Sequence, residues 1–183
     1  MKTLIVIDMQ NDFISGSLGT SEAQAIVKKV KTKINQAVKN KDAVLFTRDT
    51  HGADYLDTQE GKKLPVPHCI RYTSGWQIEK SLQIPDVRIF DKNTFGSLDF
   101  GNTLKAIWEE VTAAGEAAEG EYPMEVDFTG FCTGICVLSN VVMAKAFVPE
   151  ARVCVIENAC ACVTPQTHQT AIAAMGPIQV DVI

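Results

Sequence analysis

The feature that most constrains the fold is an alternation, from end to end of the chain, of short apolar runs with longer amphipathic stretches. The apolar runs are rich in Val, Ile and Phe and lack strict alternation with polar residues, which is typical of parallel strands buried on both faces. We predict six strands, over residues 3–7, 43–47, 87–90, 124–130, 152–157 and 178–182. The pattern predicts an α/β fold with three α/β/α layers, in which a parallel, Rossmann-like six-stranded sheet lies between helices.

Helical patterns fill the intervals between these runs. We expect helices over residues 21–39, 102–118, 136–147 and 165–175, the last with Thr164 as its cap and Pro165 in its first turn. Residues 115–121 predict an acidic, solvated turn. The segment from about residue 49 to 85 has little periodicity and many turn residues, and such long loops are usually functional. With 183 residues and no linker, the chain (1–183) is expected to form a single domain.

Charge and the start of the chain limit the partners. The 17 Lys and Arg against 22 Asp and Glu give a formal charge of -5, which argues against a nucleic-acid-binding surface. The first apolar run is ended by Asp8, so it is too short for a signal peptide or a membrane span. We therefore expect a cytoplasmic protein with no membrane contact, whose 6 cysteines are free thiols.

Residues with catalytic or ligand chemistry follow four of the predicted strands. They are Asp8 after the first, Asp49 and His51 after the second, Lys92 after the third, and Cys132 and Cys136 after the fourth. The carboxyl ends of parallel strands meet at one edge of the sheet, where doubly wound folds bind their ligands. The sequence therefore predicts that these side chains converge on one site.

Cys136 is the candidate nucleophile. It lies where a Gly-rich strand end meets an apolar helix, and a helix N-terminus favours the thiolate. Lys92 would stabilise the thiolate and later negative charge, and Asp8 would carry the proton from thiol to leaving group and then activate water. The alternative is that Cys136 is a buried small hydrophobe, Asp8 a strand-end cap and Lys92 a solvated side chain.

A metal site is the second candidate. Asp49 and His51 are two residues apart, so both side chains point to the same side if the backbone is extended, and Glu60 and His68 follow in the long loop. Imidazole and carboxylate ligands suit zinc, with iron or manganese as other possibilities. Asp and His are also common loop residues, which leaves a plain loop as the alternative.

Five segments together resemble a known family. They are LIVIDMQNDF at 4–13, TRDTH at 47–51, LPVPHC at 64–69, DKNTFGS at 91–97 and GFCTGICV at 130–137. In this order they resemble the isochorismatase-like cysteine hydrolases, and within them the nicotinamidases most. The resemblance extends from residue 1 to about 165. Gly134 and Ile135 depart from the family pattern, in which many members carry an aspartate and an aromatic residue.

The resemblance implies a catalytic triad of Asp8, Lys92 and Cys136. It implies a divalent metal, zinc above all, held by Asp49, His51 and His68, with Glu60 as an additional ligand in some members, and a cis peptide just before Cys132. Members of the family are often oligomers, so a homo-oligomer is a further expectation.

A mechanism follows from the resemblance and from the residues together. The Cys136 thiolate would attack the carboxamide carbon of nicotinamide, and the backbone N–H groups of Cys132 and Cys136 would hold the oxyanion. Asp8 would protonate the departing ammonia, and the metal would anchor the pyridine nitrogen. Phe13 and Trp76 are candidate aromatic walls around this small amide substrate, or else plain packing residues.

Three other functions stay open from the sequence. Metal-free members of the family act with the same triad on isochorismate, N-carbamoyl compounds or ureidoacrylate, although the presence of Asp49, His51 and His68 favours a nicotinamidase. The chain would be a non-catalytic metal-binding or ligand-binding protein if Cys136 were purely structural. It would be a redox thiol protein if Cys132 and Cys136 formed a reactive pair.

Overall fold

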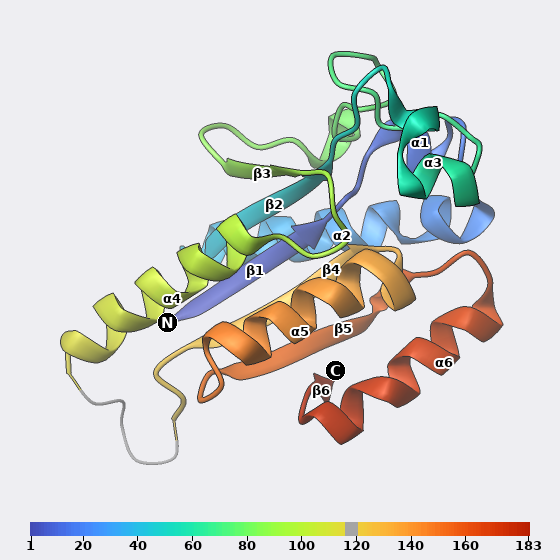
Figure 1. The fold of residues 1–183 in the computed structure, drawn as a ribbon. Coiled ribbons are helices and arrows are strands. Elements are labelled where there is room, and N and C mark those ends of the chain that lie inside the picture. Colours follow the sequence, from blue (N-terminus) through green and yellow to red (C-terminus); the bar gives the residue numbers. More distant parts are fainter. Residues whose placement is uncertain (116–120) are drawn as a thin grey trace.

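The computed structural model, which describes residues 1–115 and 121–183, has the predicted α/β architecture (Figure 1). One six-stranded sheet has the order β3-β2-β1-β4-β5-β6, and all neighbouring strands are parallel. The strands are β1 (Lys2–Ile7), β2 (Ala43–Asp49), β3 (Arg88–Lys92), β4 (Glu125–Phe131), β5 (Arg152–Ala161) and β6 (Asp181–Val182). The strand order reverses between β1 and β4, which is where such sheets form a ligand crevice.

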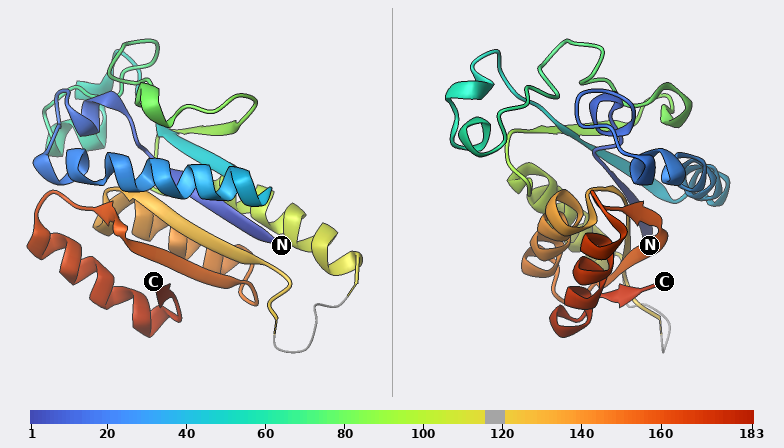
Figure 2. Two further views of the ribbon diagram at one scale, coloured as in Figure 1. Left: turned by 180° about the vertical axis from the view of Figure 1, so that it is seen from behind. Right: turned by 90° about the vertical axis from the view of Figure 1, so that its right-hand side faces the viewer.

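Helices cover both faces of this sheet. The helices of the described residues are α1 (Asn11–Ile14), α2 (Ser21–Asn40), α3 (Gln59–Lys63), α4 (Leu98–Ala113), α5 (Leu138–Phe147) and α6 (Pro165–Met175). The long α2 lies on one face, and α4, α5 and α6 lie on the other (Figures 1 and 2). Within the described residues, no helix combines the length and apolar character needed to cross a membrane.

Two apolar layers explain why the strands lack polar alternation. In β1, Leu4 and Val6 pack into the layer that contains Val30 of α2. Ile5 belongs to the opposite layer, with Leu104 of α4. Burial of both strand faces removes the polar positions that a one-sided sheet would keep, so the continuous apolar runs follow from the layered fold.

Two strands differ from the predicted bounds by more than two residues at one end. β5 was expected to end at residue 157, but the register shifts between Phe128 and Gly130 and pairing then resumes, Gly130 with Cys160. The irregular pairing carries β5 past the polar residues that mark its expected end. The last strand is shorter than predicted because a 3-10 turn, Gly176–Ile178, and a left-handed Gln179 (φ 61°) precede it.

Two predicted helices also change. α4 begins at Leu98, earlier than expected, because the Ser97 side chain accepts a hydrogen bond from the Phe100 N–H and caps the helix. α4 ends at Ala113, with Ala114 as its C-cap, so the predicted end at residue 118 is wrong, and residues 116–120 of the predicted acidic turn lie outside the described residues. The helix expected from residue 136 is preceded by a π-helical turn, Thr133–Val137, and α5 itself begins at Leu138.

The segment between β2 and β3 lies over the carboxyl edge of the sheet (Figure 1). It contains α3 and two 3-10 turns, Tyr55–Asp57 and Lys80–Leu82. An isolated bridge between Gln10 and Ile78 attaches this segment to the chain after β1, and a second between His51 and Ile70 joins two parts of the segment itself. The long loop therefore forms one wall above the strand ends, where the candidate site residues are.

Candidate active site

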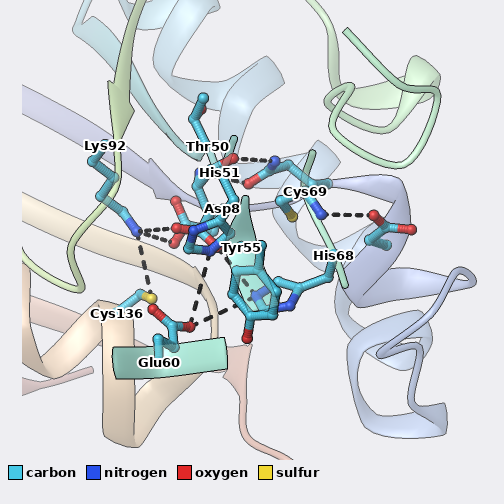
Figure 3. A network of polar contacts seen from close by, with 12 residues as sticks. Asp8, Thr50, His51, Tyr55, Glu60, His68, Cys69, Lys92 and Cys136 are labelled. Carbon is cyan, nitrogen blue, oxygen red and sulfur yellow. Dashed lines mark hydrogen bonds and ion pairs between the residues drawn. The ribbon is translucent and has the colours of Figure 1, made fainter. Parts of the chain in front are cut away.

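Asp8, Lys92 and Cys136 meet at the carboxyl edge of the sheet (Figure 3). The Lys92 Nζ atom lies 2.6 Å from Asp8 Oδ2 and 3.5 Å from Cys136 Sγ. Asp8 directly follows β1, Lys92 is the last residue of β3, and Cys136 lies in the π-helical turn after β4. Parallel strands in adjacent register bring the three side chains together although 84 and 44 residues separate them along the chain.

Asp8 is fully buried beneath the cavity floor. Its Oδ1 accepts a 2.6 Å hydrogen bond from the Thr47 hydroxyl, and its backbone is left-handed (φ 46°). Burial raises the pKa of Asp8 above its ordinary value, against the lowering effect of the Lys92 charge. Among the described residues, Oδ2 accepts no well-oriented hydrogen bond despite its ion pair with Lys92. That oxygen therefore keeps a lone pair available for a proton.

Lys92 remains charged in this buried position. Desolvation acts to lower its pKa, but the charges of Asp8 and Asp49, and that of the Cys136 sulfur when it ionises, raise the pKa above its ordinary value. Its ammonium also lies 3.7 Å from Asp49 Oδ1. The side chain is a fixed positive charge between the acid and the thiol.

The Cys136 thiol is more basic than its place in the sequence suggested. Burial, with the charges of Asp8 and Asp49, raises its pKa well above the ordinary 9.0 although Lys92 acts to lower it. The expectation that this position would favour the thiolate is therefore wrong for this conformation, since Cys136 lies inside the buried turn Thr133–Val137 and desolvation is the largest effect on its pKa. Attack by this sulfur requires a base to remove its proton.

Asp49, His51 and His68 form a compact cluster beside this group, and Figure 3 shows the two histidines. One ligand-type atom from each lies within 4.8 Å of the others, and His51 Nε2 is 2.9 Å from Asp49 Oδ2. Burial opposes ionisation of Asp49, but hydrogen bonds from both histidines and the Lys92 charge hold its pKa well below the usual range. Glu60 Oε1, from α3, lies 3.9 Å and 3.8 Å from the two histidine Nε2 atoms.

The histidines are held in place by groups that the sequence analysis did not single out. The Tyr55 ring packs edge-on against His51 and His68, with centroids 4.7 Å and 5.0 Å away. The backbone oxygen of Val66 lies 2.9 Å from His68 Nδ1, which leaves Nε2 directed to Asp49. The carbonyl beside Nδ1 orients the ring so that Nε2 faces the cluster, where it can serve as a ligand atom.

Gln10 holds the backbone of Asp49 from both sides. Its Oε1 accepts from the Asp49 N–H at 2.7 Å, and its Nε2 donates to the Asp49 carbonyl at 2.8 Å and to the Trp76 carbonyl at 2.9 Å. Gln10 belongs to the LIVIDMQNDF segment, but no role was predicted for it from the sequence. The signal in the sequence that could have indicated its role was a polar amide side chain within an apolar segment, since buried polar groups need hydrogen-bond partners.

Asn140 joins the nucleophile's turn to the loop after β3. Its Nδ2 donates to the carbonyls of Cys136 and Phe95 at 2.8 Å and 3.0 Å, and its Oδ1 accepts from the Ser97 N–H at 3.1 Å. Asn140 is fully buried on α5. This network fixes the backbone around Cys136, and the sequence analysis did not find it.

A cavity of about 1190 Å³ opens over both groups. It is lined by Phe13, His51, His68, Lys92, Cys132 and Cys136, among others. Trp76 does not line it, because the Arg48 guanidinium covers its ring at 3.4 Å from the centroid and its Nε1 donates to Thr50. Of the two expected aromatic walls, Phe13 alone faces the cavity, and Trp76 supports the loop from behind.

The peptide between Phe131 and Cys132 is cis, as the resemblance implied. Cys132 packs into the apolar layer of α2, whereas Cys136 packs into the opposite layer. The six cysteines are free in the structure. The two thiols face away from each other, so this conformation offers no support for a redox pair of Cys132 and Cys136.

A family model decides the relationship that this geometry suggests. The isochorismatase domain model matches residues 2–183. This chain belongs to the isochorismatase family. The chain is therefore a hydrolase that acts on amides. Within the family it most resembles the nicotinamidases.

Known members support this resemblance. The chain is 26% identical over 176 residues to the nicotinamidase of Saccharomyces cerevisiae, covering 79% of this chain and 81% of that one. The pyrazinamidase/nicotinamidase of Streptococcus mutans has a TM-score of 0.80 at 26% identity, with 100% of both chains covered. A pyrazinamidase of Pyrococcus horikoshii, solved in complex with zinc, has a TM-score of 0.80 at 22% identity, covering 100% of this chain and 98% of that one.

Proposed function

We propose that this amide hydrolase converts nicotinamide to nicotinate and ammonia through a thioester on Cys136. The observation that carries the proposal is that one cavity is lined both by Lys92 and Cys136, with Asp8 buried behind them in contact with Lys92, and by the Asp49, His51 and His68 cluster. The first group supplies the chemistry of amide cleavage. The second gives the site a way to select a ring that carries a ligand nitrogen.

In the proposed first step, Asp8 takes the Cys136 proton as the sulfur attacks the carboxamide carbon. The raised pKa of the thiol makes this base necessary, and the raised pKa of Asp8 makes the carboxyl a better acceptor. The Lys92 ammonium, 3.5 Å from the sulfur, stabilises the thiolate as it forms. The N–H groups of Cys132 and Cys136 are the proposed donors to the oxyanion.

Release of ammonia and hydrolysis of the thioester use the same acid in turn. Asp8 gives its proton to the departing nitrogen, and the C–N bond breaks to leave the acyl group on sulfur. Asp8 then takes a proton from water, whose oxygen attacks the acyl carbon, and the thiol is restored. No histidine is required as the base, which leaves His51 and His68 for another role.

Asp49, His51 and His68 fit a divalent metal. Two imidazole side chains and a carboxylate of low pKa are a donor set that suits zinc, with iron or manganese as other possibilities. When bound, the ion supplies a Lewis acid that can accept a pyridine nitrogen as ligand. Glu60 is proposed as an additional ligand, and Phe13, 5.5 Å from the His68 ring centre, as a wall for the substrate ring.

The test is release of ammonia from nicotinamide by purified, zinc-loaded protein. We expect turnover in the wild type, loss of at least about 10⁴-fold in Cys136→Ala, and a raised KM as the main effect of His51→Ala. Release from a carbamoyl amide but not from nicotinamide would refute the substrate assignment and leave the triad intact. Full activity of Cys136→Ala would refute the mechanism.

A further inference from the structure

Cys132 and Cys162 lie side by side where β4 and β5 end. The parallel register pairs Gly130 with Cys160 and Phe131 with Ala161, so the next pair along the two chains is Cys132 and Cys162. Adjacent strands are about 4.8 Å apart, within the roughly 4.4–6.8 Å between Cα atoms that a disulfide needs. Both side chains also belong to one apolar layer.

The surroundings make the two sulfurs chemically unequal. Burial acts to raise the pKa of Cys162, but hydrogen bonds from Cys132, Thr167 and the backbone N–H groups of Gly134 and Val163 lower it below the ordinary value. Burial, together with its hydrogen bond to Cys162, raises the pKa of Cys132 to about 12. Cys162 is thus the more reactive thiol, and Cys132 is the thiol that donates to it.

Gly134 helps to create this environment. A Cβ atom at residue 134 would lie 3.7 Å from the Cys162 sulfur and 3.4 Å from the Ala171 Cβ. The sulfur is therefore in close contact with the backbone of the turn Thr133–Val137, which also carries Cys136. Any covalent change at Cys162 acts directly on the segment that positions the nucleophile.

We propose that Cys132 and Cys162 are a peroxide-sensitive thiol pair that closes to a disulfide beside the nucleophile. The Cys162 thiolate attacks one oxygen of a peroxide, the O–O bond breaks, and the second oxygen leaves as water or an alcohol after taking a proton. The resulting sulfenic acid is attacked by the Cys132 sulfur, which loses its proton as the S–S bond forms and the S–O bond breaks to release water. Two thiols are oxidised by two electrons, and one peroxide is reduced.

The pair lies next to the active-site cavity. This position gives a peroxide a route to the thiols and lets the disulfide affect catalysis. Cys132 and Val163, the neighbour of Cys162, both line the cavity. The disulfide holds Cys132, whose N–H is a proposed oxyanion donor, to the end of β5. This effect on catalysis rests on the proposed function, whereas formation of the disulfide does not.

The remaining cysteines provide a control. Burial raises the pKa of Cys154 to about 12, and Cys154 lies in the interior of β5. Its replacement removes a buried thiol from the same strand without touching the pair. Cys154→Ser is therefore the matched control for Cys162→Ser.

The experiment maps disulfides by mass spectrometry after brief treatment with hydrogen peroxide. It uses Cys136→Ser as the background, so that oxidation of the nucleophile does not interfere, and adds Cys162→Ser or Cys154→Ser to it. We expect a Cys132–Cys162 linked peptide in the background and in the Cys154→Ser protein, its loss on reduction with dithiothreitol, and its absence from the Cys162→Ser protein. Linkage of Cys132 to another cysteine, or oxidation to sulfinic acid without linkage, would overturn the proposal.

Ammonia release by the protein with Cys136 intact tests the effect on catalysis separately. We expect the linked form to be at least about tenfold less active, with recovery on reduction, because loss of one oxyanion donor costs ~10²–10³-fold. The Cys162→Ser protein should not show this reversible loss of activity, and the Cys154→Ser protein should show it. A linked form with full activity would overturn the proposed effect on the turn. Since the mass measurement needs no turnover, failure of the nicotinamidase assignment cannot be mistaken for failure of the disulfide.

Discussion

The Lys92 ammonium lies 2.6 Å from the Asp8 carboxylate, and both side chains are buried at the carboxyl edge of the sheet. The same ammonium is 3.5 Å from the Cys136 sulfur. One fixed positive charge therefore contacts both the group that gives up a proton and the group proposed to take it. Lys92 therefore stabilises the negative charge whether it is on Asp8 or on the Cys136 sulfur, so proton transfer between the two changes the interaction with Lys92 little.

Asp8→Asn should separate proton transfer from folding. Asparagine has the same shape and can still accept the Thr47 hydrogen bond, but it cannot accept the thiol proton. We expect kcat to fall about 10²–10⁴-fold with a smaller change in KM, as measured by ammonia release. Asp127→Asn is the control, since Asp127 is a buried strand aspartate that pairs with Lys2 at 2.9 Å, away from the site. Equal loss of kcat in both variants would contradict the role of Asp8.

The dependence of kcat/KM on pH should reflect two raised pKa values. Asp8 must be deprotonated to act as a base, so activity is lost as the pH falls through a pKa that lies above the ordinary 3.8. Asp8 acts as a base only while Cys136 is a thiol. Because the pKa of Cys136 lies well above 9.0, the thiol form persists to alkaline pH. We expect the acid limb to disappear in Asp8→Asn, with kcat/KM measured at constant ionic strength. A wild-type acid limb at or below pH 3.8 would contradict this assignment.

Gln10→Glu should weaken metal binding without changing a ligand. A carboxylate in place of the amide Nε2 would face the carbonyls of Asp49 and Trp76 as an unpaired acceptor, and the Asp49 backbone would shift. We expect zinc affinity, measured by competition with a chelator, to fall about 10–100-fold. Gln24→Glu, an exposed change of the same kind on α2, should leave affinity unchanged. The same affinity in both variants would show that Gln10 does not position Asp49.

Gly130→Ala should destabilise the junction of β1 and β4. Gly130 has φ 122°, and a Cβ there would lie 2.1 Å from the Ile7 carbonyl oxygen, so the backbone must move. We expect the free energy of unfolding in urea to fall by more than about 2 kcal/mol. Gly176→Ala is the control because its Cβ would meet no atom within 4 Å, and we expect a change within about 0.5 kcal/mol. A similar small change at both glycines would refute the steric argument.

Local pattern was sufficient to predict the sheet and where to look for the site. The apolar runs gave the six strands because burial on both faces leaves a direct trace in the sequence. The carboxyl ends of those strands then pointed to Asp8, Lys92 and Cys136, which the structure brings together. Strand and helix ends were less well predicted, since the bulge in β5 and the Ser97 cap depend on contacts between neighbouring elements.

The sequence by itself determined the layered fold, the residue types at the strand ends and the family they resemble. The tertiary structure decided the raised pKa of the Cys136 thiol, the absence of Trp76 from the cavity lining and the contact between Cys132 and Cys162. It also revealed Gln10 and Asn140 as the residues that hold the two halves of the site. These properties depend on desolvation and on contacts between segments distant in the chain, and neither is encoded in a local pattern.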